Sequence, residues 1–373
     1  MKVIILKNNL KNGLDAISGV VGGSNALPVL KNFLIETFDN KIKLTGTNLE
    51  IGINSFIPAK VVENGSITIP LSIFNSIIVN LKNERINLEV ENNNLTIKTD
   101  NYQAKIQGIK KEEFPIIPQI KNTEFYLEIP NITIKDSLLS IINAAQTSEL
   151  KPEISGILFD YQINVLKLAA TDTFRLAEKT LYNTQFKSNI DTSFKTIIPL
   201  KTIQEVVKIF KNEDGDNVSI FFDQNQVVFK NENTELISRL ISGEFPDYQS
   251  IIPQSTEIEI SLNKSELINA VKLASSFTNK FNEIKIIAKE KSKNIEVFSS
   301  VQGVGENNYL IPAKIKGKTI EIVFNWRFFL DGLKNIIDSE EVFIGLNNDN
   351  KPVIVKTPND TSCFYILMPI KAG

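Results

Sequence analysis

The chain has 373 residues and 42% of them are hydrophobic, which is enough apolar side chain for the cores of two or three domains. Lysine and arginine (41) nearly balance aspartate and glutamate (43), giving a formal net charge of -2. This balance excludes a strongly basic protein, so a nucleic-acid surface would require local segregation of lysines. With one cysteine, Cys363, and no histidine, the composition excludes an intramolecular disulfide and the usual zinc sites.

The N-terminal stretch MKVIILKNNLKNGLDAI has four consecutive apolar residues before Lys7, far fewer than a signal-peptide core or a membrane span needs. Together with the single cysteine, this pattern predicts a cytoplasmic protein with no membrane partner. Histidine is the usual base and ligand of hydrolases, so its absence argues against catalytic residues, a metal site or a cofactor.

Apolar residues recur at helical spacing in three places, which predicts three short amphipathic helices. The first group is Leu10, Leu14, Ile17 and Val21, the second is Ile134, Leu138, Ile141 and Ala145, and the third is Leu267, Val271 and Ala274. The groups are about 125 residues apart, which is an ordinary domain length. The spacing therefore predicts three copies of one structural unit.

Each copy continues with a strand and a second helix. The strand patterns are IKLTGTNLEI (42–51), LKLAATDTFRL (166–176) and IEVFSS (295–300). The second helices are predicted from Ile69, Ile198 and Phe324, with Pro70 and Pro199 at the first helical position of the first two. The remaining segments mostly alternate as strands, for example INLEVENNNLTIKTD (86–100), whose asparagines predict a hairpin turn.

Two proline-bearing segments, EFPIIPQI (113–120) and GEFPDYQSIIPQ (243–254), interrupt the strand patterns near the ends of the first two copies. The chain is therefore predicted to have an α+β fold of mostly antiparallel sheets, in three domains at residues 1–121, 122–253 and 254–373.

Lysines fall on the predicted helices of every copy, where they are able to follow a phosphate backbone without reading bases. Ordinary solvated helix faces explain them equally well, because lysine is abundant throughout the chain. The candidate DNA-facing residues are Lys7, Lys11, Lys135, Lys201, Lys208, Lys264 and Lys272.

Four motifs, spread over all three copies, resemble the bacterial DNA polymerase III beta subunit family, the sliding clamps. They are LPVLKNFLIE (27–36), TDTFRLAEK (171–179), GEFPDYQSIIP (243–253) and YILMPIKAG (365–373). The resemblance implies three repeated DNA-clamp domains, with helices lining a ring pore and antiparallel sheets outside. It further implies a head-to-tail homodimer that encircles double-stranded DNA irrespective of sequence and acts as a non-enzymatic processivity factor.

The resemblance also implies a peptide-binding groove between the second and third domains, used by the DNA polymerase III alpha subunit, the clamp loader and other proteins with a clamp-binding motif. Such a groove suits a short apolar peptide. The positions that match the family's groove are Ile154, Thr171, Thr173, Phe174, Arg175, Leu176, Pro246, Ser250, Ile251, Pro352, Ile366, Met368, Pro369 and Ile370.

The chain departs from the family pattern in three places. Thr173 and Phe174 replace the usual Gly-His pair, which predicts a bulkier groove floor. Ser24 and Asn25 stand where many relatives have arginine, which puts a DNA contact there in doubt. Lys371 stands where relatives often have arginine.

Two other classes of function are compatible with the composition. One is an enzyme that uses carboxylates and lysine, which would show a turnover that a single substitution abolishes. The other is a repetitive β-rich binding protein unrelated to replication, which would form no ring on DNA.

Overall fold

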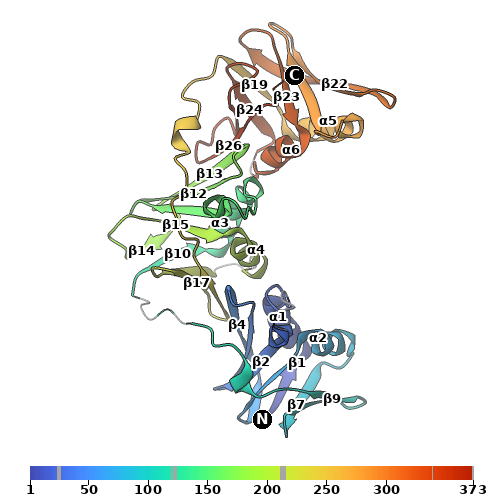
Figure 1. Ribbon diagram of the computed structural model, residues 1–373, viewed down its shortest axis with the longest axis vertical. Coiled ribbons are helices and arrows are strands. Elements are labelled where there is room, and N and C mark those ends of the chain that lie inside the picture. Colours follow the sequence, from blue (N-terminus) through green and yellow to red (C-terminus); the bar gives the residue numbers. More distant parts are fainter. Residues whose placement is uncertain (23–26, 119, 121–123, 211–215, 338, 372–373) are drawn as a thin grey trace. The chain divides into compact units, whose positions relative to one another are not determined.

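The computed structural model describes residues 1–22, 27–118, 120, 124–210, 216–337 and 339–371. Within these residues the chain forms antiparallel sheets and six α-helices, which confirms the predicted α+β class (Figure 1). The helices are α1 (Lys7–Ile17), α2 (Leu71–Asn80), α3 (Asn131–Leu139), α4 (Leu200–Ile209), α5 (Lys264–Ala274) and α6 (Trp326–Lys334). None of the helices in this part of the chain is long and apolar enough to cross a membrane.

The chain divides into two compact units. Unit 1 comprises Met1–Ile132, Lys187–Ile190 and Gln204–Leu240, and unit 2 comprises Thr133–Phe186, Asp191–Ile203 and Ile241–Gly373.

Unit 1 contains two sheets. The smaller one has, in spatial order, β5 (Lys60–Glu63), β1 (Lys2–Leu6), β7 (Arg85–Glu91), β8 (Asn94–Lys98) and β9 (Gln103–Gln107). The larger one has β14 (Lys187–Ser188), β10 (Tyr126–Pro130), β16 (Asn217–Phe222), β17 (Gln226–Lys230), β18 (Thr234–Arg239), β4 (Ile51–Pro58), β3 (Lys41–Thr47), β2 (Asn32–Phe38) and β6 (Ser66–Pro70). Helices α1 and α2 lie side by side in this unit (Figure 1).

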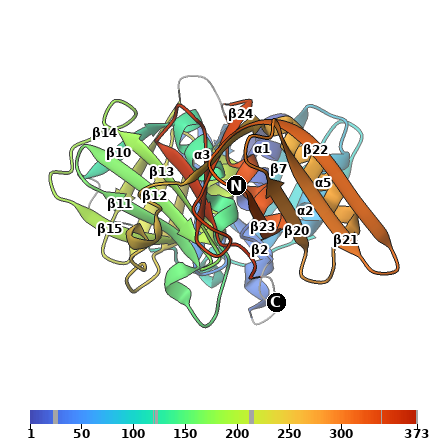
Figure 2. The same cartoon turned by 90° about the horizontal axis from the view of Figure 1, so that it is seen from above.

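Unit 2 is built on one sheet of twelve strands, and α5 lies against its β21–β22 hairpin (Figure 2). The spatial order is β15 (Phe194–Pro199), β11 (Gly156–Tyr161), β12 (Val165–Thr171), β13 (Arg175–Tyr182), β26 (Cys363–Leu367), β25 (Val353–Lys356), β24 (Glu341–Leu346), β19 (Ile258–Asn263), β22 (Gly305–Lys316), β21 (Asn294–Val301), β20 (Glu283–Ala288) and β23 (Ile320–Asn325).

The sheets join strands that lie on opposite sides of the predicted domain boundaries. In unit 1, β4 pairs with β18, so that Ile53 faces Leu236. In unit 2, β13 pairs with β26, so that Leu176 faces Ile366. These four side chains are buried, and the apolar surface they remove from water stabilises each pairing. The sequence pattern predicted the strands but not these long-range partners.

The predicted helices are all present, but their ends differ from the prediction. Helix α1 ends at Ile17, before Val21, and α3 ends at Leu139, before Ile141 and Ala145. The placement of both prolines at the first helical position was wrong. Pro70 ends β6 and Pro199 ends β15, so each lies one residue before its helix. Their extended backbone completes the strand and removes a donor where pairing stops.

In the third copy, asparagine occupies the position just before each helix. The Asn263 side chain accepts from the Glu266 amide (2.9 Å) before α5, and that of Asn325 accepts from the Arg327 amide (3.0 Å) before α6. Asparagine is a favoured N-cap because its side chain satisfies an otherwise unpaired amide of the first turn. At the second helix of each copy, the strand-to-helix step is therefore made by proline in the first two copies and by asparagine in the third.

A tight loop joins β12 to β13 and is held by its own side chains. The Thr171 hydroxyl donates to the Arg175 carbonyl (2.7 Å) and accepts from the Thr173 amide (3.2 Å). The Asp172 carboxylate accepts from the amides of Phe174 (3.0 Å) and Arg175 (3.1 Å). Thr173 has a φ of +77°, in the left-handed region that a β-branched residue rarely adopts. The loop therefore holds backbone strain at Thr173.

Unit 1 has the same loop between β3 and β4. The Thr47 hydroxyl donates to the Ile51 carbonyl (2.9 Å) and accepts from the Leu49 amide (3.0 Å), and Leu49 also has a φ of +77°. The Asn48 side chain accepts from the amides of Glu50 (3.0 Å) and Ile51 (2.8 Å). The predicted repeat therefore extends to individual hydrogen bonds and to one unusual backbone angle.

Each loop also meets the end of a strand from later in the chain. The Met368 amide donates to the Phe174 carbonyl (2.9 Å) in unit 2, and the Arg239 amide donates to the Glu50 carbonyl (3.1 Å) in unit 1. The side chains at these matched positions differ in chemistry. Phe174 and Met368 are apolar, whereas Glu50 and Arg239 form an exposed ion pair at 3.7 Å.

Two lysines at helix starts bond to the end of the neighbouring helix. The Lys7 ammonium donates to the carbonyls of Val79 (3.2 Å) and Leu81, at the end of α2. The Lys264 ammonium donates to the Ile336 carbonyl (3.0 Å), just beyond α6. A cation at a helix C-terminus satisfies carbonyls that lack an intrahelical partner and interacts favourably with the helix dipole.

Replacing Thr173 with glycine is expected to raise the free energy of unfolding by about 1 kcal/mol, because glycine adopts a left-handed φ without a Cβ clash. The measurement is urea unfolding of the full chain. Thr361 is an exposed threonine of the same unit with no left-handed φ, and Thr361→Gly is expected to be neutral or destabilising. A destabilised Thr173→Gly variant would contradict the strain.

Lys7→Met and Lys264→Met are each expected to lower the free energy of unfolding by about 1 kcal/mol, because helix-end carbonyls lose a charged donor. Matched controls are Lys11→Met and Lys272→Met, which remove exposed lysines of the same helices. Urea unfolding of the four variants measures the difference. Equal losses in all four would show that the helix-end bonds contribute nothing specific.

Candidate functional site

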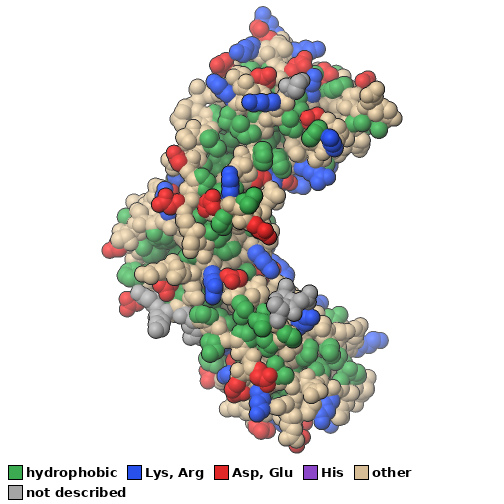
Figure 3. Space-filling view, in the orientation of Figure 1, with side chains coloured by type: hydrophobic (Ala, Val, Ile, Leu, Met, Phe, Trp, Pro, Cys, Tyr) green, Lys and Arg blue, Asp and Glu red, His purple; other side chains and the backbone are tan. Residues whose placement is uncertain are grey.

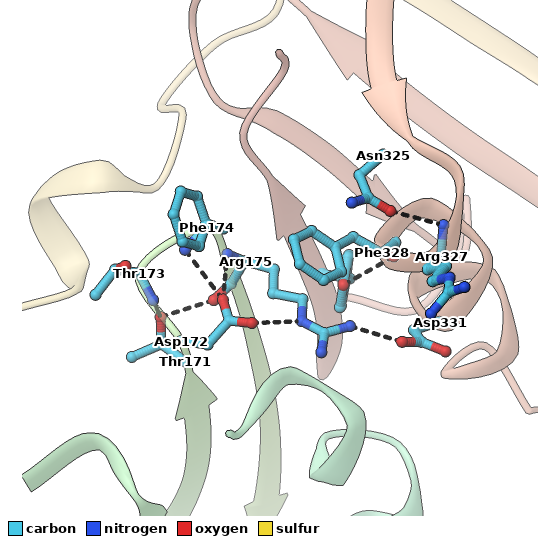
Figure 4. A network of polar contacts seen from close by, with 10 residues as sticks. Thr171, Asp172, Thr173, Phe174, Arg175, Asn325, Arg327, Phe328 and Asp331 are labelled. Atoms are coloured by element: carbon cyan, nitrogen blue, oxygen red, sulfur yellow. Dashed lines mark hydrogen bonds and ion pairs between the residues drawn. The ribbon is translucent and has the colours of Figure 1, made fainter. Parts of the chain in front are cut away.

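Arg175 is the polar centre of the candidate site in unit 2 (Figure 4). Its Nε donates to Asp172 Oδ2 (2.9 Å) in the loop, and its Nη1 donates to Asp331 Oδ2 (2.6 Å) on α6. The guanidinium carbon lies 4.3 Å from the centroid of the Phe328 ring. Only 10% of the Arg175 side chain is exposed. Arg175 thus ties β13 to α6, with its charge already matched by two carboxylates.

The groups around Arg175 and Tyr365 keep both side chains protonated. Burial acts to lower the pKa of Arg175, but the hydrogen bonds and charges of the Asp331 and Asp172 carboxylates raise that pKa above its ordinary value. Burial raises the pKa of Tyr365, whose hydroxyl donates to the Phe328 carbonyl (2.9 Å). Both groups therefore keep their protons at neutral pH, and neither donor is lost.

An apolar surface lies beside this polar network. The Phe174 ring is 59% exposed and stacks on Phe328, with ring centroids 6.4 Å apart and planes at 28°. Met368 is 36% exposed, and its amide holds the Phe174 carbonyl. Large apolar side chains left open to solvent beside one another are a usual feature of peptide-binding surfaces. Methionine adds a flexible lining that adapts to different side chains.

The segment of residues 243–254 supplies another part of the site. Phe245, Tyr248 and Ile252 pack against a buried cluster formed by Leu158, Ala169, Leu176 and Ile366. The 3-10 turn Gln249–Ile251 follows, and Ile251 is 44% exposed. The segment therefore packs its apolar anchors against the sheet and leaves the candidate groove residue Ile251 exposed.

The fourteen positions predicted from the resemblance fall into three classes of exposure. Thr173, Phe174, Pro246, Ser250, Ile251 and Met368 are exposed, and Arg175, Pro352, Pro369 and Ile370 are half-buried. Ile154, Thr171, Leu176 and Ile366 are buried. A backbone hydrogen bond joins Phe174 with Met368, and the pairing of β13 with β26 places Leu176 opposite Ile366. The exposed class is able to touch a ligand directly, whereas the buried class supports it from behind.

Sequence reasoning missed Phe328 and Asp331. Both lie on α6, in the predicted helix FNWRFFLDGLKNI, where they look like one aromatic and one acid among several. A sequence signal for Asp331 was the need of the half-buried Arg175 for a second acidic partner. The sequence offered no indication of which acid would supply it.

The candidate DNA-facing lysines differ in their bonding partners and in their exposure to solvent. Lys7 and Lys264 bond to helix ends, and the Lys208 ammonium lies 3.6 Å from Glu205. Lys135 is half-buried, whereas Lys11, Lys201 and Lys272 are exposed. On the face shown in Figure 3, basic side chains are interspersed with acidic ones. The exposed lysines are therefore the stronger candidates for phosphate contacts.

Of the family departures, Ser24 and Asn25 lie outside the described residues, and Lys371 is exposed. Across the ranges that the structure describes, no group of three or more His, Cys, Asp or Glu residues is placed to hold a metal ion.

Three family models match successive parts of the chain. The N-terminal domain of the DNA polymerase III beta subunit matches residues 1–118, the central domain matches residues 128–247, and the C-terminal domain matches residues 249–371.

Whole proteins are similar over their full length. A beta sliding clamp of Bacillus subtilis (strain 168) is 29% identical over 383 residues, covering 100% of both chains. One of Chlamydia pneumoniae is 28% identical over 374 residues, covering 100% of this chain and 99% of that protein. The crystal structure of the DNA polymerase sliding clamp from Bacillus subtilis has a TM-score of 0.93 and 28% identity, with both chains fully covered.

Because the three domain matches follow one another along the chain and the relatives align over their whole length, the chain belongs to the DNA polymerase III beta subunit family, the beta sliding clamps, which are non-catalytic processivity factors of that polymerase.

Proposed function

We propose that this chain tethers its partners by binding a short apolar peptide segment in the groove of unit 2. The observation that carries the proposal is the pairing of exposed Phe174 with exposed Met368 through the bond between their backbones. The groove would serve the DNA polymerase III alpha subunit, the clamp loader and other proteins with a clamp-binding motif.

The chemistry of the groove favours apolar over acidic peptides. Arg175 is engaged by Asp172 and Asp331, so it offers little charge to an incoming carboxylate. The exposed ring of Phe174, stacked on Phe328, offers an aromatic face to an aliphatic or aromatic side chain. Polar groups such as the Ser250 hydroxyl would fix the register of the peptide.

We further propose that two copies of the chain close head to tail into a ring around double-stranded DNA. Topology then prevents escape, so weak contacts from exposed lysines to phosphates are sufficient, and base contacts are not needed. The near-zero net charge of the chain agrees with such a mechanism, because tight binding to phosphate would hinder sliding.

Phe174→Ala and Met368→Ala are each expected to weaken binding of a fluorescent clamp-binding peptide by about tenfold or more, since each removes exposed apolar surface at the centre of the groove. Glu50→Ala is the matched control, because Glu50 holds the place in the unit 1 loop that Phe174 holds in unit 2. Fluorescence anisotropy gives the affinities. Full affinity after deletion of residues 368–373 would defeat the groove assignment.

The ring proposal predicts retention of the loaded protein on circular DNA and its loss from linearised DNA at moderate salt. Charge reversal of Lys11, Lys201 and Lys272 to glutamate is expected to reduce retention on circles and to flatten its salt dependence. The control variant carries the same reversal at Lys60, Lys187 and Lys318, which lie on or beside strands. Its net charge changes by the same amount as that of the helix-lysine variant. Equal retention of the loaded wild type on both DNA forms would mean ordinary surface binding.

A further inference from the structure

Three residues of the candidate groove lie on a segment that has little regular structure of its own. Pro246, Ser250 and Ile251 belong to the connection that follows β18, whose one regular element is the 3-10 turn Gln249–Ile251 (Figure 1). The backbone bonds of this turn are local, from Ile251 to Tyr248 (3.2 Å) and from Ile252 to Gln249 (3.2 Å). They shape the turn but do not attach it to the sheet.

Phe245 and Ile252 pack against the sheet, but Tyr248 is the most deeply buried of the three and also forms a hydrogen bond to it. Among residues 242–251, all of which the structure describes, only Tyr248 is buried, with 5% of its surface exposed. Its hydroxyl donates to Glu178 Oε2 at 2.6 Å. Glu178 lies on β13 and is itself 6% exposed. The bond therefore joins the segment to the middle of the strand that begins with Arg175.

The Tyr248 ring makes the same connection through apolar contacts. It packs with Leu158, Ala169, Leu176 and Ile366, which belong to four adjacent strands of the unit 2 sheet. Leu176 and Ile366 face each other across β13 and β26. Leu176 lies two residues after Phe174, and Ile366 lies two residues before Met368. The Tyr248 side chain thus contacts β13 and β26, the strands next to Phe174 and Met368 of the candidate groove.

The hydrogen bond has a fixed direction. Burial, followed by the bond to Glu178, raises the pKa of Tyr248 far above its ordinary value, so the phenol keeps its proton and acts as the donor. Glu178 Oε1 also accepts from the Thr180 hydroxyl (3.3 Å). A bond between a neutral donor and a buried carboxylate is stronger than one between two neutral groups.

We propose that Tyr248, through its bond to Glu178, is the positioning residue that docks the 243–254 segment on the sheet and so sets the width of the peptide groove. Tyr248 itself touches no peptide. The inference rests on the proposed peptide-binding function of the same site. It predicts that peptide affinity depends on an interaction located behind the groove.

The test compares peptide binding by full-length variants that change one partner of the bond. Tyr248→Phe keeps the ring and its packing but removes the donor, and Glu178→Leu removes the acceptor. Each is expected to weaken peptide binding about tenfold, because the docked, binding-competent form of the segment becomes less populated. Glu178→Gln keeps an acceptor oxygen and is expected to stay within about threefold of the wild type.

Two controls separate positioning from general stability. Tyr182→Phe removes a hydroxyl from an exposed tyrosine at the far end of β13 and is expected to bind like the wild type. Hydrogen exchange at the amides of residues 244–252 is expected to accelerate in Tyr248→Phe, while the strands of the sheet keep their protection. The double variant Tyr248→Phe/Glu178→Leu should bind no more weakly than either single variant.

The outcomes are distinguishable. If the wild type binds the peptide and Tyr248→Phe binds it equally well, the positioning role is overturned while the groove assignment stands. If Tyr248→Phe weakens binding but Glu178→Leu does not, the role of Glu178 is overturned. If the wild type itself does not bind the peptide, the proposed function fails, and the positioning inference fails with it.

Discussion

The candidate site depends on the antiparallel pairing of β13 with β26. This pairing joins strands that lie far apart in the sequence, so forming it costs loop-closure entropy, which burial of Leu176, Ile366 and their neighbours offsets. The pairing places Phe174 next to Met368 and gives Tyr248 a surface on which to pack. The polar network around Arg175 then fixes α6 against the end of the same strand. Without this strand pair, the residues of the groove would remain on separate pieces of chain.

The local features of the fold could be predicted from the sequence because they are encoded locally. Apolar periodicity predicted the helices, and the asparagines at 92 and 93 have φ values of 48° and 59°, as the predicted hairpin turn requires. The TNLEI and TDTFR strings, predicted as parts of strands, form matching loops, because threonine and Asx side chains form the same short hydrogen bonds wherever the spacing recurs. The candidate groove positions were predicted from short, continuous family motifs, and their role stays a prediction.

The remaining features depend on contacts between distant residues, which no local pattern encodes. Asp331 is one acid among many in the sequence, and only the packing of α6 near β13 makes it the partner of Arg175. Lys7 and Lys264 resembled the other helix lysines, but each reaches the end of a second helix that lies far along the chain. The prolines at 70 and 199 were misplaced by one residue because a strand runs directly into each helix, with no loop to mark the junction.

The duplicated loop bears on how such a protein changes over evolutionary time. In both copies the hydrogen bonds that hold the loop use the threonine, the Asx residue and the backbone, and they make no use of the side chain at the fourth position. That position is consequently free to be glutamate in one copy and phenylalanine in the other. A chain that separates the residues that shape a loop from the residue that the loop displays is able to acquire a new binding preference without refolding. The same loop thus displays the charged Glu50 in one unit and the apolar Phe174 in the other.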